Sequence, residues 1–178
     1  MKYLASIVLV ALASISTVHA QEADKHAKSG TPSTSLHISG AVKKPTDFSV
    51  VALRQMTGQD TGKMPVVCAS GATVATVKNF RGVRLIDVLD RVGIDTKGHK
   101  DGRSMVVIAR ATDGYVVTFS WSELYNTPIG DGVLVAYEKD GKPLEPGEGQ
   151  LLLISGKDIK TGPRHVRWLS EIEVKREQ

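Results

Sequence analysis

The sequence predicts an α+β domain in which strands predominate and the helices are few and short. Short β-branched runs recur along the chain, and turns containing Gly, Pro, Asn or Asp separate them. The clearest helical pattern is Leu85–Val92, which places apolar residues at i, i+3, i+4 and i+7, and Gly93 can end that helix. The 178 residues are enough for one domain with a substantial core.

The first 20 residues are typical of a cleaved secretory signal peptide. Lys2 provides the positive start, Leu4–Val18 is apolar, and Val18-His19-Ala20 is a suitable cleavage site. The apolar run is short for a membrane span and no second one follows it, so we expect a periplasmic protein without a membrane span after cleavage. Residues 21–35 are polar and predict a flexible lead-in to one domain at 36–178.

The other elements follow in order from the same patterns. Alternating or continuously apolar runs predict strands at 36–42, 64–70, 73–80, 104–111, 115–119, 132–137 and 168–174. Leu151–Ile154 is apolar throughout, so we expect this strand to be central. Gly82 is expected to end the strand at 73–80. Short helices are predicted at 48–56, 85–92 and 121–125, and Ser120 can cap the last of them.

Charge and cysteine usage narrow the classes of function. The net charge is only +4, basic residues are scattered among acidic ones, and aromatic residues are few, so we expect no nucleic-acid partner. A single cysteine, Cys68, cannot form an internal disulfide. Such a thiol is either a small buried apolar side chain or a reactive ligand, and the sequence leaves both open.

A basic stretch near the C-terminus, Thr161–Leu169, contains Arg164, His165 and Arg167 and follows the glycine-containing loop Ser155–Lys160. Glycine lets backbone N–H groups approach a ligand, and Arg and Lys donate to phosphate or carboxylate. The stretch therefore predicts either an anion-binding corner at the start of a strand or a solvated basic loop. Earlier in the chain, Asp113 and Tyr115 flank a tight turn. Asp113 is expected either to line a pocket or to cap the turn.

The sharpest chemical hypothesis combines Cys68 with this basic corner. A thiolate is a good ligand for a soft or high-valent metal, and a single protein thiolate suits a metal whose other ligands come from an organic cofactor. The basic corner could hold a phosphate of that cofactor. The sequence contains no nucleotide-binding loop, paired metal-binding histidines, nucleophile elbow or haem motif.

Several segments together resemble the oxidoreductase molybdopterin-binding domain of the sulfite oxidase family. The two most specific are the hairpin that contains Ala136-Tyr137-Glu138 and the signature Gly162–Leu169. The resemblance covers Leu36–Val174, and it also includes weaker matches at 36–45, 66–68 and 81–89. It implies the sulfite-oxidase-type fold and a molybdenum–molybdopterin cofactor without haem.

The resemblance also implies roles for individual residues. Cys68 corresponds to the molybdenum ligand, and His165, Val166 and Arg167 correspond to a triplet that helps hold the pterin. Lys160 and Arg164 would assist, and Asp113 would lie near the pocket. The loaded centre would transfer an oxygen atom or electrons, so a redox protein partner in the periplasm would be required.

The chain departs from the family pattern where the cofactor phosphate is held. Leu151–Ile154 carries no arginine at the position where the family has one, and Pro146–Gln150 offers no equivalent of a polar residue found there. The loop Gly156–Gly162 is longer than usual. The leading expectation is therefore a molybdopterin-dependent oxidoreductase domain, intact or degenerate, with a redox or signalling protein as its periplasmic partner. The alternative is a cofactor-free periplasmic module that binds a small anionic ligand or a partner protein, with Cys68 as a buried thiol.

Overall fold

The computed structural model describes residues 31–98 and 100–177. The predicted signal peptide and residues 21–30 of the predicted lead-in lie outside the described residues. The end of the lead-in is attached to the domain, because the Thr112 hydroxyl donates to the Thr31 carbonyl at 2.6 Å and the Gln150 amide donates to the Ser33 carbonyl at 3.2 Å. The first strand begins at Ser35.

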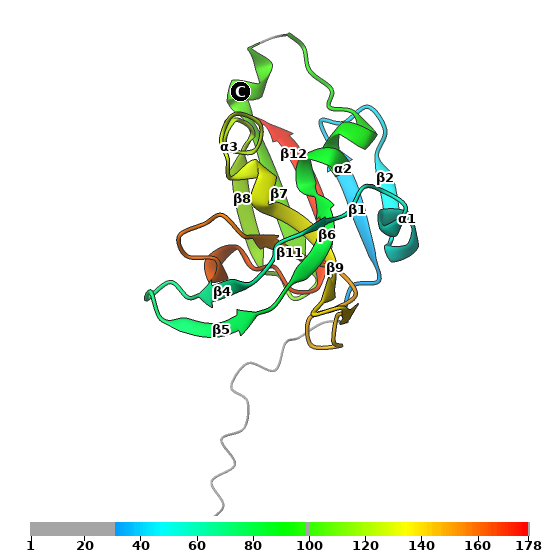
Figure 1. The fold of residues 1–178 in the computed structure, drawn as a ribbon. Coiled ribbons are helices and arrows are strands. Elements are labelled where there is room, and N and C mark those ends of the chain that lie inside the picture. Colours follow the sequence, from blue (N-terminus) through cyan, green and yellow to red (C-terminus); the bar gives the residue numbers. More distant parts are fainter. Residues whose placement is uncertain (1–30, 99, 178) are drawn as a thin grey trace, which may run out of the picture.

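The first sheet joins the two ends of the described chain (Figure 1). Its order is β2 (Thr46–Ser49), β1 (Ser35–Gly40), β12 (Leu169–Arg176), β7 (Met105–Ala111) and β8 (Val116–Ser120). Strands β1 and β12 pair in parallel, whereas the other neighbours are antiparallel. The alternation of apolar residues along β7 and β8 places one face of this sheet in the core.

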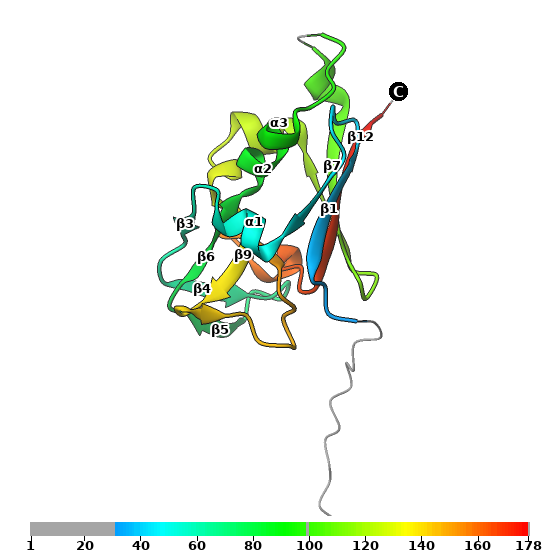
Figure 2. The same cartoon turned by 90° about the vertical axis from the view of Figure 1, so that its right-hand side faces the viewer.

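In the described part of the chain, the second sheet also has five strands. It has the order β10 (Lys142–Pro143), β9 (Val133–Lys139), β6 (Phe80–Arg84) and β3 (Gln59–Asp60), and β11 (Leu152–Ser155) also pairs with β9. A separate hairpin of β4 (Met64–Val67) and β5 (Thr73–Val77) extends beside it. Figure 2 shows β1, β7 and β12 on one side of the molecule and β6 and β9 on the other. The larger apolar core lies between them, and a smaller apolar core packs the β4–β5 hairpin against β6, β9 and β11.

The helices in the described part are short, as predicted. They are α1 (Val50–Arg54), α2 (Leu85–Val92) and α3 (Trp121–Asn126), with 3₁₀ turns η1 (Asp101–Ser104), η2 (Gly130–Gly132) and η3 (Gly162–Arg164). The prediction for α2 is confirmed, and α3 is capped by Ser120, whose hydroxyl accepts from the Glu123 amide at 3.0 Å. None of the described helices is long and apolar enough to cross a membrane.

Several predictions about the strands were wrong. Residues 73–80 do not form one strand, because β5 ends at Val77 and β6 begins at Phe80. The strand expected at 64–70 ends at Val67, so Cys68 lies outside it. Gly82 does not end a strand; it lies inside β6, where a Cβ would come within 2.3 Å of the Val135 carbonyl oxygen on β9. The apolar strand β11 is fully buried but has only β9 as a strand neighbour. Its other edge is covered by the basic stretch, because Leu153 and Val166 exchange backbone hydrogen bonds of 2.9 and 2.8 Å.

The predicted helix at 48–56 begins later than expected. Phe48 belongs to β2, which pairs with β1, and its side chain is buried in the core. The helix starts only at Val50, after Ser49 accepts a hydrogen bond from the Ala52 amide at 3.2 Å. Pairing with β1 therefore decided the conformation of a segment whose periodicity alone favoured a helix.

Candidate functional site

Cys68 lies in the turn of the β4–β5 hairpin, directly after β4. Its amide donates to the Ala72 carbonyl at 2.9 Å, and the Gly71 amide donates to the Cys68 carbonyl at 2.9 Å. Gly71 has a φ of +92°, which favours glycine at this position. These backbone contacts hold a half-buried thiol at the tip of the hairpin rather than in either apolar core.

The surroundings of the thiol favour its ionised form. The Cys68 sulfur lies 2.8 Å from the Ser70 hydroxyl oxygen. Hydrogen bonding from this hydroxyl, and then from the Ser70 backbone amide, lowers the pKa of Cys68 below the ordinary value for a thiol. The thiolate is the form that binds metals and acts as a nucleophile. Cys68 is thus placed for chemistry, and the reading of it as a buried core thiol does not describe this geometry.

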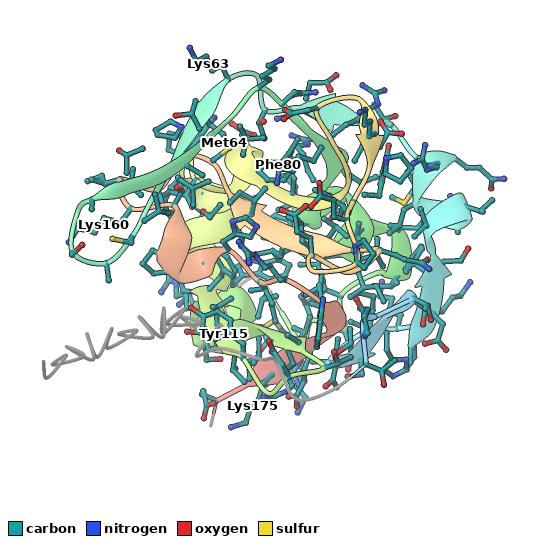
Figure 3. The ribbon with its side chains drawn as sticks, turned by 90° about the horizontal axis from the view of Figure 1, so that it is seen from below. Lys63, Met64, Phe80, Tyr115, Lys160 and Lys175 are labelled. Carbon is teal, nitrogen blue, oxygen red and sulfur yellow. The ribbon has the colours of Figure 1, made fainter. Side chains whose placement is uncertain are left out.

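The loop before η3 fixes the hairpin in place. The buried Thr161 hydroxyl accepts from the Val67 amide at 3.0 Å and donates to the Pro65 carbonyl at 2.9 Å. Lys160 donates to the Ala69 carbonyl at 2.5 Å, and Figure 3 shows this lysine beside the end of the hairpin. A Cβ at Gly162 would lie 2.8 Å from the Val67 carbonyl oxygen, so the close approach of the two segments requires glycine.

A cavity of about 510 Å³ opens beside the thiol. Its polar lining comes from separate parts of the chain and comprises Cys68, Asp113, Tyr115, His165 and Arg167. The remaining wall includes apolar side chains of Val66 and Val74. Four residues predicted from the sequence, Cys68, Asp113, His165 and Arg167, therefore line the same cavity.

The polar cavity residues come from three parts of the fold, which are the Cys68 turn, the β7–β8 turn and the stretch after η3. Asp113 accepts from the Tyr115 amide at 3.1 Å, so this carboxylate both caps its turn and lines the cavity. The Tyr115 hydroxyl donates to the Pro163 carbonyl at 2.6 Å and joins the β7–β8 turn to η3. His165 contacts the buried Phe80 ring edge-on, with ring centroids 5.7 Å apart. Arg167 is exposed and forms no ion pair with any described residue.

Three other predicted residues lie outside the cavity lining. Val166 is fully buried and pairs with β11 through its backbone. Lys160 is directed to the Cys68 turn by its contact with Ala69. Arg164 forms a two-pronged ion pair with Asp158 at 2.7 and 2.5 Å and a further contact with Glu123 at 2.8 Å.

The environment of Arg164 is that of a structural arginine. Its guanidinium carbon lies 4.3 Å from the centre of the Phe119 ring. Burial works to lower the pKa of Arg164, but hydrogen bonds to Asp158 and Glu123 outweigh it and raise the pKa above its ordinary value. The basic corner therefore divides into Arg164, a partly buried arginine that stabilises the loop, and Arg167, which is exposed at the cavity.

Some residues that shape the site gave little signal in the sequence. Ser70 contacts the thiol only because the hairpin turn brings the two together, and Thr161 connects segments more than ninety positions apart. Among the described residues, no group of three or more His, Cys, Asp or Glu side chains could hold a metal ion.

Comparison with known proteins decides the family. The family described as "Oxidoreductase molybdopterin binding domain" matches residues 24–178. The chain belongs to this family. Its fold is similar to that of the sulfane dehydrogenase SoxCD from Paracoccus pantotrophus, with a TM-score of 0.64 and 16% sequence identity. A search of curated proteins finds no significant match.

The similarity to SoxCD covers 80% of this chain but only 38% of the SoxCD chain. At this level of identity the likeness shows the fold alone. It confirms the prediction of a sulfite-oxidase-type fold of the α+β class, in which strands predominate.

Proposed function

We propose that this molybdopterin-binding domain is an exported oxidoreductase domain whose cofactor lies in the cavity at Cys68. The observation that carries the proposal is the convergence of Cys68, Asp113, His165 and Arg167 on one cavity of about 510 Å³. A volume of this size is within the range of cofactor sites in proteins. The periplasmic location and a separate redox protein partner are parts of the same proposal.

The residues present fit the metal and pterin end of such a cofactor. Cys68 supplies a thiolate whose pKa is lowered by Ser70, which is the form a metal requires. Val66 and Val74 provide apolar walls for a flat ring system, while His165 and Asp113 provide polar groups at its edge. When bound, the molybdenum centre would supply oxygen-atom or electron transfer.

The chain's own residues would bind and orient the group. Ser70 would donate its hydroxyl hydrogen to the thiolate and keep it ionised. Arg167 would provide the positive charge for an anionic part of the ligand. Tyr115, whose hydroxyl donates to the Pro163 carbonyl, would keep the β7–β8 turn and η3 together beside the cavity.

A second function is favoured by the state of the residues that would contact the phosphate of the cofactor. Arg164 is engaged by Asp158 and Glu123, Lys160 by Ala69, and β11 presents only buried side chains. Each charge-assisted hydrogen bond that is not available to a phosphate removes about 1.5–3 kcal/mol of binding free energy. On this reading the cavity holds a small anion or a protein segment, in a module that works without metal.

The decisive experiment is a measurement of molybdenum per chain after periplasmic expression in a host that makes the cofactor. The oxidoreductase proposal predicts close to one molybdenum per chain, lost in Cys68→Ser and reduced in Arg167→Ala. Lys142→Ala removes an exposed charge on β10, away from the cavity, and should leave the metal content unchanged. Correctly exported wild-type protein that contains no molybdenum would overturn the proposal in favour of the metal-free module.

A further inference from the structure

A larger cavity than the one at Cys68 lies between α1, the segment that follows it, and α2. Its volume is about 760 Å³, and its lining includes Ala52, Met56, Gly58, Arg84, Asp87 and Arg91. A second hollow of about 510 Å³ shares Phe48, Ala52 and Arg91 with it and adds Lys44. The two hollows are adjacent because they share these residues, and together they are called the α1–α2 groove.

The charges in the α1–α2 groove leave one arginine uncompensated. Asp87, four residues before Arg91 on α2, would be the natural partner of that arginine. Instead, Arg84 holds both carboxylate oxygens of Asp87, with hydrogen bonds of 2.8 and 2.7 Å. Hydrogen bonding to Asp87 raises the pKa of Arg84, in agreement with a firm pair.

The other carboxylates near Arg91 are also engaged. The Asp47 carboxylate accepts a hydrogen bond from the His37 imidazole at 2.8 Å, and Asp90 accepts one from the Tyr125 hydroxyl at 2.9 Å. Within residues 31–98 and 100–177, neither Arg91 nor Lys44 forms an ion pair. The groove thus has three cationic side chains against two acidic ones, and its excess charge is positive.

Part of the lining of the α1–α2 groove is apolar. Phe48 is almost completely buried beneath the groove, and Ala52 and Met56 are half-buried along α1 and its end. A methionine and an aromatic ring give a polarisable surface that adapts to an apolar ligand. The α1–α2 groove therefore combines these apolar contacts with polar groups of Gln55, Thr57 and Gln59 and with the guanidinium of Arg91.

We propose that the α1–α2 groove is a ligand site, separate from the Cys68 cavity, for a small amphipathic carboxylate. Arg91 binds the carboxylate through its planar guanidinium, whose donors match two carboxylate oxygens. Phe48, Ala52 and Met56 contact the apolar body. The pairing of Arg84 with Asp87 keeps that acidic side chain away from Arg91 and so leaves the site open to an anion.

The test uses phenylbutyrate and its neutral isostere phenylbutyramide, with amide NMR spectra of the metal-free wild-type protein. Phenylbutyrate should shift amide signals of α1, Thr57, Gly58 and the end of α2, and leave those of the Cys68 turn unchanged. Loss of one charge-assisted hydrogen bond corresponds to about tenfold in affinity, so the amide should bind about tenfold more weakly. Arg91→Gln should reduce phenylbutyrate affinity by the same factor.

Two further variants make the result decisive. Ala52→Phe fills the groove without changing charge and should abolish the binding of both probes. Arg103→Gln removes another exposed arginine, on η1, and should change nothing. Equal affinity for the acid and the amide, an unchanged affinity in Arg91→Gln, or signal shifts confined to the Cys68 turn would each overturn the proposal. Thermal unfolding of each variant identifies any that has lost its fold, and in that case Ala52→Leu replaces Ala52→Phe.

Discussion

Replacement of Arg164 by methionine tests whether this arginine is structural or available to a ligand. The side chain is only 20% exposed, and its partner Asp158 is 10% exposed. Arg164→Met keeps most of the volume that packs on Phe119 but removes the charge. Asp158 and Glu123 would then be left as two carboxylates without their shared cation.

The expected loss of stability is large for a single substitution. Removal of one member of a buried ion pair costs about 3–5 kcal/mol, because the remaining charge stays desolvated. Partial exposure of the pair places Arg164→Met at the lower end, near 3 kcal/mol. For a domain of this size, about 2–4 °C is lost per kcal/mol, so the melting temperature should fall by about 6–12 °C.

The assay is urea unfolding followed by circular dichroism, with Arg167→Met as the matched control. Arg167 is exposed and unpaired among the described residues, so its replacement should change the free energy of unfolding by less than about 0.5 kcal/mol. The double variant Arg164→Met/Asp158→Asn should be more stable than the sum of the single losses predicts, because the carboxylate is no longer unpaired. A loss below about 1 kcal/mol in Arg164→Met would refute the structural role and return Arg164 to the set of ligand-binding residues.

Two further predictions concern the thiol and the second sheet. In metal-free protein, Ser70→Ala should raise the pKa of Cys68. Alkylation by iodoacetamide should then reach half its maximal rate at a higher pH than in the wild type. An unchanged pH profile would show that the hydroxyl does not stabilise the thiolate. Gly82→Ala should destabilise the fold by about 1–3 kcal/mol or more, because the new methyl group meets the Val135 carbonyl. A Cβ added at Gly147 would meet nothing within 4 Å, so Gly147→Ala should be neutral in the same urea titration.

Local patterns were sufficient for much of the fold. The helix Leu85–Val92 and the cap at Ser120 depend on residues close in sequence, and the structure confirms both. The specific motif Gly162–Leu169 likewise indicated the family, which the match over residues 24–178 shows. The errors at Gly82 and Phe48 arose where pairing with a distant strand decided the conformation.

The sequence by itself determined the fold class, the family and four residues that line the cavity at Cys68, because strand patterns and motifs are local properties of the chain. Only the tertiary structure decided which basic residues of the corner face that cavity. Arg164 and Arg167 are only three residues apart, yet one is paired with Asp158 and Glu123 and the other is exposed at the cavity. Ion pairing depends on which carboxylates the fold brings within a few ångströms, and no spacing in the sequence encodes that distance.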